Sequence, residues 1–142
     1  MKYYFAKLDS NNNVTNVYAV AHKDCLDSDG SASEIVGINF LNNLYNTSDT
    51  YKQTWKERKL GSQERLYRKN YAGIGMLYKA DIDVFIGQQP YSSWTINSEK
   101  EWEAPLSQPT LTEQQIAGNK AYRWDESLYQ SDNTKGWVLF DL

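Results

Sequence analysis

Two apolar segments at the start of the chain predict a β-hairpin. Residues 2–8 and 14–22 flank the run Asp9-Ser10-Asn11-Asn12-Asn13. Asp, Asn and Ser form turns because their short side chains bond the local backbone, and Asn tolerates positive φ. Both faces of the second segment are fairly apolar, so we expect that strand to be covered on each side.

A helix is predicted after this hairpin. Ser31 and Glu34 have the S-x-x-E spacing of a capping box, in which each side chain satisfies the other residue's free N–H, so we expect the helix to begin there. Apolar residues then recur at helical spacing and form one stripe, which we expect to lie across the sheet for about three turns. The stripe consists of Ile35, Ile38, Leu41, Leu44 and Tyr45.

The remaining pattern predicts strands and hairpins. Residues 51–55 alternate as a strand does, and residues 56–64 are polar and predict an exposed loop. The predicted hairpins join residues 76–79 with 84–87, residues 94–97 with 101–104, and residues 122–124 through an Asp125-Glu126-Ser127 turn with either 128–129 or 136–140. Pro90, Pro105 and Pro109 separate these units, because proline lacks the N–H that a strand needs.

We therefore predict an α+β fold with a mainly antiparallel β-sheet, hairpins, and one α-helix in the N-terminal half. A length of 142 residues suits one domain. We expect a single β-rich domain over residues 1–142, with a semi-separate hairpin arm over about residues 92–142.

Each predicted hairpin carries an aromatic residue, an Asx three positions on, and a second aromatic seven or eight positions on. We expect the two aromatics to face each other across the strand pair, where such pairs contribute about 0.2–1 kcal/mol each. A ligand-stacking surface is the weaker interpretation. The instances are Tyr78/Asp81/Phe85, Trp94/Asn97/Trp102 and Tyr122/Asp125/Tyr129.

Composition and charge change this picture little. Five Trp, eleven Tyr and four Phe accompany a mean hydropathy of −0.73, which suits a compact aromatic core or a domain that docks on a neighbour. The net charge of −3 is too small to indicate nucleic acid or a membrane as partner. Residues 52–69 nevertheless hold seven cations against two acids, a local +5 that leaves −8 elsewhere. Such separation favours complementary protein faces, although a solvated loop is the commoner meaning of one charge run.

No residue pattern predicts catalysis or a bound group. Gly73-Ile74-Gly75 lacks the third glycine and the helix of a dinucleotide loop. His22 and Cys25 lack an orienting third group, and Asp81 with Asp83 are ordinary turn formers. We expect no enzyme activity and no cofactor.

An acidic cluster precedes the predicted helix. Asp24, Asp27 and Asp29 with Gly30 depart from the calcium-loop order, because glycine follows the second acid and no Glu stands at the twelfth position. A turn is the better interpretation, so we expect no metal site.

The candidate binding residues are aromatic and basic. The run from Arg65 to Tyr71 could stack single-stranded nucleic acid, but a protein surface fits better, since Tyr and Arg are enriched at interfaces. The predicted anchors are Tyr67, Tyr71, Tyr91 and Trp94, and the residues expected to meet acidic patches are Arg58, Arg65, Arg68 and Lys69.

Several segments resemble a family of small structural proteins of tailed phages that infect marine cyanobacteria. These are YYFAKLDSNNNVTNVYAV, LDSDGSASEIVGINFLNNLY, KQTW followed by YRKNYAGIGMLYKADIDVFIGQQPYSSWTIN, and the ending AYRWDESLYQ with GWVLFDL. The sequence departs from the family in a longer basic insertion around residues 56–64 and at residues 130–135.

The resemblance implies an accessory virion protein, on the head or at the neck, tail or fibres, that binds capsid or tail subunits, with self-association left open. It implies no catalytic residues. We expect synthesis in the host cytoplasm, since the first residues lack a signal-peptide core and no apolar run could span a membrane. The alternative is a carbohydrate-binding module that contacts host glycans through Trp94, Trp102 and Trp124.

Overall fold

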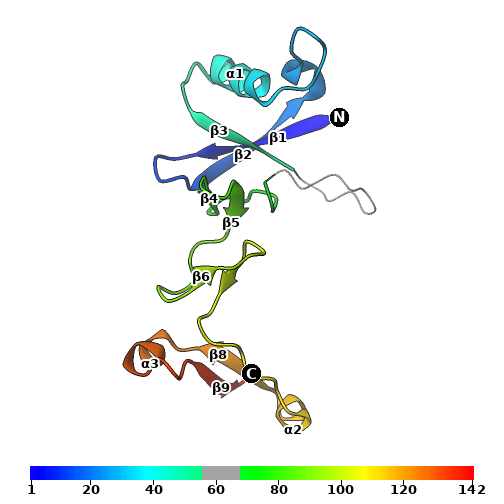
Figure 1. Ribbon diagram of the computed structural model, residues 1–142. Helices are drawn as coiled ribbons and strands as arrows, with labels where there is room; N and C mark the ends of the chain where they lie inside the picture. The colour runs from blue at the N-terminus through cyan, green and yellow to red at the C-terminus, as the bar shows by residue number, and fades with distance from the viewer. Residues whose placement is uncertain (56–67) are drawn as a thin grey trace. The chain divides into compact units, whose positions relative to one another are not determined.

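The computed structural model describes residues 1–55 and 68–142, and the chain divides into two compact units (Figure 1). The first unit is Met1–Gln88 and the second is Gln89–Leu142. The expected hairpin arm was placed from about residue 92, close to this division. The loop predicted over residues 56–64 lies outside the described residues. Among those that are described, no helix is both long and apolar enough to cross a membrane.

The first unit is built on a three-stranded antiparallel sheet in the order β2-β1-β3. A short hairpin, β4-β5, and a helix accompany the sheet. The elements are β1 (Lys2–Leu8), β2 (Val14–Ala21), the 3-10 helix η1 (His22–Cys25), α1 (Glu34–Tyr45), β3 (Thr50–Thr54), β4 (Leu77–Lys79) and β5 (Val84–Ile86).

Each face of this sheet buries its own apolar cluster. The face toward α1 and η1 holds Phe5, Val20, Cys25, Leu41 and Tyr51. The face toward the β4-β5 hairpin holds Ala6, Leu8, Val14, Ala72, Tyr78 and Phe85. The strand at residues 14–22 therefore contributes side chains to both clusters, but it is not covered throughout, because Thr15, Asn16 and Ala19 are exposed. The sheet is the middle of three layers.

A β-bulge near the first turn places Val14 and Val17 on the same face of the sheet. Lys7 pairs with Asn16 but Leu8 pairs with Val14, so β2 has one extra residue there. Val14 and Val17 are three positions apart and would face opposite sides of a regular strand. The extra residue brings both onto the β4-β5 side.

The N-cap of α1 lies two residues later than predicted, so the predicted Ser31–Glu34 capping box is wrong. Ser33 is the N-cap, and its Oγ accepts a hydrogen bond from the Val36 N–H at 3.5 Å. Ser31 instead belongs to a turn in which the Asp27 carboxylate accepts its N–H. The Glu34 side chain is bound elsewhere, as described below.

The second unit consists of two hairpins and two short helices. The elements are β6 (Thr95–Ile96), β7 (Trp102–Glu103), α2 (Glu113–Ala117), β8 (Lys120–Trp124), α3 (Glu126–Ser131) and β9 (Trp137–Asp141). Strand β8 pairs with β9, so of the two predicted returns the later one is correct. The predicted turn at residues 125–127 is wrong: Asp125 caps α3 by accepting the Leu128 N–H at 2.9 Å.

The α+β class is confirmed, with antiparallel sheets and few helices. The single predicted helix is α1. Its predicted apolar stripe is partly wrong, because Ile35, Leu44 and Tyr45 are exposed and only Leu41 of the five is fully buried. Helices α2 and α3 are additional and contain only five and six residues, too few for a periodic apolar pattern to reveal them.

The expected facing aromatics occur in one hairpin of three. Tyr78 lies opposite Phe85, with ring centroids 5.2 Å apart. In the second hairpin Trp102 lies opposite Ile96, so its expected pairing with Trp94 is wrong. In the third hairpin the partner of Tyr122 is Leu139 rather than Tyr129.

Gly37 allows α1 to approach the sheet closely, so adding a methyl group at this position should destabilise the unit. A Cβ at this position would lie 2.3 Å from Phe5 Cζ and 3.1 Å from Cys25 Sγ. Both neighbours are fully buried, so they have little room to move. Overpacking of this kind costs about 1–3 kcal/mol and exceeds the gain of about 1 kcal/mol in helix propensity. We expect Gly37→Ala to lower the free energy of unfolding by roughly 1–2 kcal/mol, measured by urea denaturation followed by circular dichroism.

The matched control is Asn39→Ala, on an exposed position of the same helix. It adds helix propensity without a clash, so its free energy of unfolding should stay within about 0.5 kcal/mol of wild type. Equal stability of the Gly37→Ala protein and the control would contradict the close packing of α1.

Candidate functional site

The residues predicted to bind a partner are divided between the two units. Arg68, Lys69 and Tyr71 belong to the first unit, and Tyr91 and Trp94 to the second. Three others, Arg58, Arg65 and Tyr67, lie outside the described residues.

The segment of residues 68–72 is fixed against β5 and β3 through its backbone. The Lys69 carbonyl accepts the Phe85 N–H at 3.1 Å, and the Asn70 side chain donates to the Phe85 carbonyl at 2.8 Å. The Ala72 N–H donates to the buried Thr54 hydroxyl at 2.9 Å. This segment is therefore part of the first unit's fold rather than a loose basic arm.

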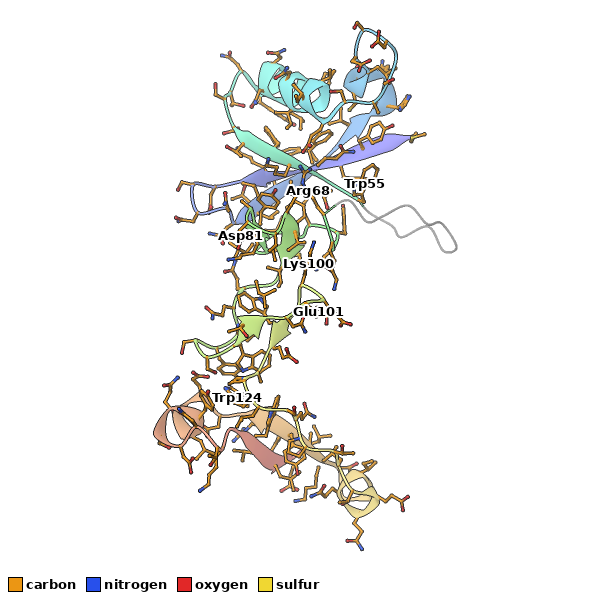
Figure 2. The ribbon with its side chains drawn as sticks, in the orientation of Figure 1. Trp55, Arg68, Asp81, Lys100, Glu101 and Trp124 are labelled. Atoms are coloured by element: carbon orange, nitrogen blue, oxygen red, sulfur yellow. The ribbon has the colours of Figure 1, made fainter. Side chains whose placement is uncertain are left out.

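Arg68 points into the unit and joins three of its elements (Figure 2). Its guanidinium binds both carboxylate oxygens of Glu34 on α1, at 2.6 and 3.1 Å. It also donates to the Gln53 carbonyl of β3 at 3.1 Å and, through Nε, to Asp83 in the β4-β5 turn at 2.8 Å. Only 6% of its side chain is exposed, so Arg68 serves the fold and its charge does not face a partner.

Hydrogen bonds within this cluster favour the charged forms of Arg68 and Asp83. Burial acts to lower the pKa of Arg68, but the hydrogen bonds that Arg68 donates to Glu34 and Asp83 outweigh burial and raise the pKa. Burial raises the pKa of Tyr78 to about 12, assisted by its hydrogen bond to Asp83. Burial opposes ionisation of Asp83, yet its bonds from Tyr78 and Arg68 hold its pKa below the usual value. Arg68 and Asp83 are therefore an ion pair at neutral pH.

Tyr71 is the exposed aromatic of the same segment. Its side chain is 39% exposed, and its ring packs edge-on against Tyr4 with centroids 5.9 Å apart. A rigid, partly exposed tyrosine of this kind is suited to contact another protein, since it offers apolar area at low entropic cost.

The other two predicted anchors belong to an aromatic cluster in the second unit. The Trp94 ring lies 5.5 Å from Tyr91 and 6.2 Å from both Trp124 and Trp137. Trp124 is 5% exposed and also contacts Tyr129 at 5.2 Å. Tyr91 is 37% exposed, so it is the member of this cluster best placed to contact a partner.

One carboxylate holds the aromatic cluster together. Glu126, at the start of α3, accepts hydrogen bonds from Trp124 Nε1 at 2.8 Å and from the Ser93 hydroxyl at 2.7 Å. Its other oxygen accepts from Ser92 at 3.0 Å and Gln130 at 2.8 Å. These donors, Trp124 first, lower the pKa of Glu126 to about 2. Glu126 therefore ties the segment before β6 to the β8-β9 hairpin.

The tryptophans expected to stack on a glycan do not form one exposed platform. Trp124 is buried, and its ring meets Trp94 and Trp137 nearly edge-to-face, at 77° and 74°. A sugar-binding platform needs open ring faces, so Trp124 cannot contribute to one. The Trp94 indole N–H is buried, with no hydrogen-bond acceptor among the described residues.

An open depression of about 590 Å³ lies beside the first turn, at Lys7, Asp9, Thr15 and Asp49. Its charged groups already have partners: Lys7 Nζ binds Asp49 at 3.0 Å, and Asp9 accepts the N–H groups of Asn11 and Asn13. This hydrogen bond raises the pKa of Lys7 and lowers that of Asp49. Both groups are therefore charged at neutral pH and poorly suited to exchange protons.

The other groups considered for chemistry have local structural roles. Asp27 accepts the N–H groups of Asp29 and Ser31 within its own turn. His22 Nδ1 lies 2.9 Å from the Tyr3 hydroxyl, whereas Cys25 is buried, which raises the pKa of its thiol. Across residues 1–55 and 68–142, no group of three or more His, Cys, Asp or Glu side chains could hold a metal ion.

Sequence reasoning missed the acids that organise both units. The sequence predicts that Glu34 caps the helix and that Asp83 forms a turn, yet both bind Arg68 across the sheet. Glu126 was assigned to a turn. Short-range patterns gave no signal for the contacts of Arg68 with Glu34 and Asp83 or of Glu126 with Ser92, because these partners are 15 to 34 residues apart.

Comparison of the chain with protein-family models, curated proteins and solved structures finds no match. The resemblance to cyanophage structural proteins therefore stays a prediction from the residues.

Removing the Arg68 charge should destabilise the first unit. In Arg68→Met the carboxylates of Glu34 and Asp83 lose their cation, and breaking a buried pair of this kind costs about 3–5 kcal/mol. Because Asp83 is 48% exposed, we expect a loss near the lower limit, roughly 3 kcal/mol, in urea denaturation followed by circular dichroism.

Lys79→Met is the control for Arg68→Met. It removes a partly exposed cation that lies 3.8 Å from the exposed Asp81, and surface pairs contribute less than about 1 kcal/mol. Similar losses of stability in the two variants would show that Arg68 is an ordinary surface charge.

The lowered pKa of Glu126 predicts acid sensitivity in the second unit. A carboxyl with a usual pKa of 4.5 that falls to about 2 on folding stabilises the fold above pH 4.5, and this contribution is lost as pH falls toward 2. In Glu126→Gln all four donors face a neutral amide, so stability should be lower at pH 7 and vary less between pH 4.5 and 2. Tryptophan fluorescence during urea denaturation at each pH measures this difference.

Glu103→Gln, at an exposed position of β7, should leave the pH profile like that of wild type. An unchanged profile in Glu126→Gln would show that Glu126 does not link these segments in solution.

Proposed function

We propose that the protein is an accessory structural component of a phage virion that binds neighbouring virion subunits, on the head or at the neck, tail or fibres. This role requires surface complementarity and no reaction. It agrees with the resemblance found in the sequence and with the local roles of the groups considered for chemistry.

The observation that carries the proposal is the division of charge between two compact units. The second unit, Gln89–Leu142, holds four cations and eight acids, a net charge of −4. The first unit, Met1–Gln88, holds eleven cations and ten acids, a net charge of +1. Its cations are concentrated in residues 52–69, which carry +5 including the buried Arg68. Opposite charges on one chain allow it to meet both acidic and basic neighbours, and they favour rapid, salt-sensitive docking.

The exposed tyrosines supply anchors for such docking. Tyr71 and Tyr91 are 39% and 37% exposed, and each is held by a neighbouring aromatic ring. Interfaces derive much of their affinity from a few tyrosine, tryptophan and arginine side chains. Arg68 is no longer among the proposed contacts, because its guanidinium is buried.

The test is a pull-down of proteins from disrupted virions of a phage that encodes this chain, across a salt series. We expect capture of a capsid or tail subunit that weakens as salt rises. Tyr71→Ala or Tyr91→Ala should weaken capture by roughly tenfold. Ile116→Ala removes a 60% exposed apolar side chain of α2 and serves as the control.

Two results would contradict the proposal. One is capture that neither salt nor the tyrosine variants affect. The other is a chain that ignores virion proteins and is retained on a glycan array, which would favour the carbohydrate-binding alternative.

A further inference from the structure

The two edge strands of the sheet in the first unit, β3 and β2, differ in how their outward backbone groups are hydrogen-bonded. At β3 the Gln53 N–H donates to Glu34 at 2.8 Å, and the Gln53 carbonyl accepts from Arg68 at 3.1 Å. Side chains therefore satisfy backbone groups that a further strand would need. Strand β2 forms the opposite edge.

The pairing of β1 with β2 identifies which backbone groups of β2 point outward. The His22 N–H donates to the Met1 carbonyl at 3.1 Å, so these residues form a hydrogen-bonded pair. Bonded and non-bonded pairs alternate along an antiparallel ladder. By the observed register, Val17 and Ala19 occupy non-bonded positions, and their N–H and C=O groups face away from β1.

One end of this outer edge is already paired. The Val14 N–H donates to the Met76 carbonyl, and the Val14 carbonyl accepts the Gly75 N–H, both at 2.8 Å. Farther along the strand, Val17 and Ala19 have no outward hydrogen-bond partner in the described part of the chain. The open stretch thus begins where the contact with residues 75–76 ends.

Apart from the β-bulge near the first turn, this open edge lacks the features that normally keep strands apart. Strand β2 reads VTNVYAVA, with no charged residue and no proline. Natural proteins protect exposed edges with Lys, Pro, inward-pointing charges or a covering element. An uncharged edge rich in β-branched residues is a template for another strand.

We propose that β2 pairs with β2 of a second copy of this chain, antiparallel across a two-fold axis. The two three-stranded sheets would join into one, with Val17 opposite Ala19 of the partner subunit and each pair exchanging both backbone hydrogen bonds. Tyr18 would lie beside Tyr18 of the partner subunit, a favourable aromatic pair.

A second copy is the occupant that the composition of β2 favours. Because the strand carries no charge, self-pairing places no like charges opposite one another. The absence of charge also gives β2 no means to select a charged foreign strand. This inference stands apart from the proposed function, since it concerns the purified chain alone.

Sedimentation and hydrogen exchange of the full chain over a concentration series test the pairing. We expect a monomer–dimer equilibrium in which the amides of Val17 and Ala19 become protected as the dimer forms. The amide of Gln53, already bonded to Glu34, should show no such dependence on concentration.

Charge variants at Ala19 provide the second arm of the test. Ala19 is exposed, and in the proposed register it lies diagonally across from Ala19 of the partner subunit, on the same face of the sheet. Ala19→Lys and Ala19→Glu should therefore fold while each weakens self-association by roughly tenfold through like-charge repulsion. Mixing the two variants should restore association, since opposite charges then meet. Ala117→Lys, an exposed alanine of α2, should associate as wild type does.

A chain that stays monomeric at every concentration would overturn the proposal. So would a dimer that Ala19→Lys leaves intact, or one that forms without protecting Val17 and Ala19. If the β2 amides become protected only when a virion protein is added, the occupant is a foreign strand, and the second-copy assignment is wrong.

Discussion

One guanidinium group connects the layers of the first unit. The sheet has α1 on one face and the β4-β5 hairpin on the other, and the apolar clusters on the two faces do not touch through it. Arg68 reaches Glu34 of the first layer, Gln53 of the sheet edge and Asp83 of the third layer. Its position also requires an unusual backbone, with φ of 60° at Arg68 and 51° at Asp83. Non-glycine residues keep such angles only where surrounding contacts determine them, and this ion cluster is such a set of contacts.

The second unit, Gln89–Leu142, is smaller and is also stabilised by a charged side chain next to an apolar cluster. A small domain buries too little surface to be stable without large side chains. Trp94, Trp124 and Trp137 supply that area, and Gly136 makes room for them: a Cβ there would lie 2.3 Å from the Trp124 ring. Glu126 then fixes the orientation of the Trp124 ring through its N–H. Apolar packing alone does not fix the orientation of side chains. In both units the directional hydrogen bonds of a carboxylate supply that orientation.

The sequence was informative wherever the cause of structure is local. The Asx-rich turn at residues 9–13, the two-sided apolar pattern of β2 and the Tyr78–Phe85 pair follow from neighbours a few positions apart. It was uninformative where a distant residue decides the outcome. The helix cap moved from Ser31 to Ser33 while Glu34 bound Arg68, 34 positions away. Asp125 is equally suited to a turn and an N-cap, and in the structure it caps α3, with Tyr129 of that helix against Trp124. Among the candidate contacts, Tyr71 and Tyr91 are exposed, but the burial of Arg68 could not be foreseen from a basic run.

The division of the chain into two units also divides its tryptophans, whose fluorescence reports unfolding. Of the five tryptophans only Trp55 belongs to the first unit, and Trp94, Trp102, Trp124 and Trp137 belong to the second. Each unit has its own core, so the chain need not unfold in one step, and a single melting temperature would then have no defined meaning. Indole emission would follow mainly the loss of the second unit, whereas far-ultraviolet dichroism would follow both. Two unfolding curves that fail to coincide would thus be the natural signature of a chain whose cores are built from different aromatics.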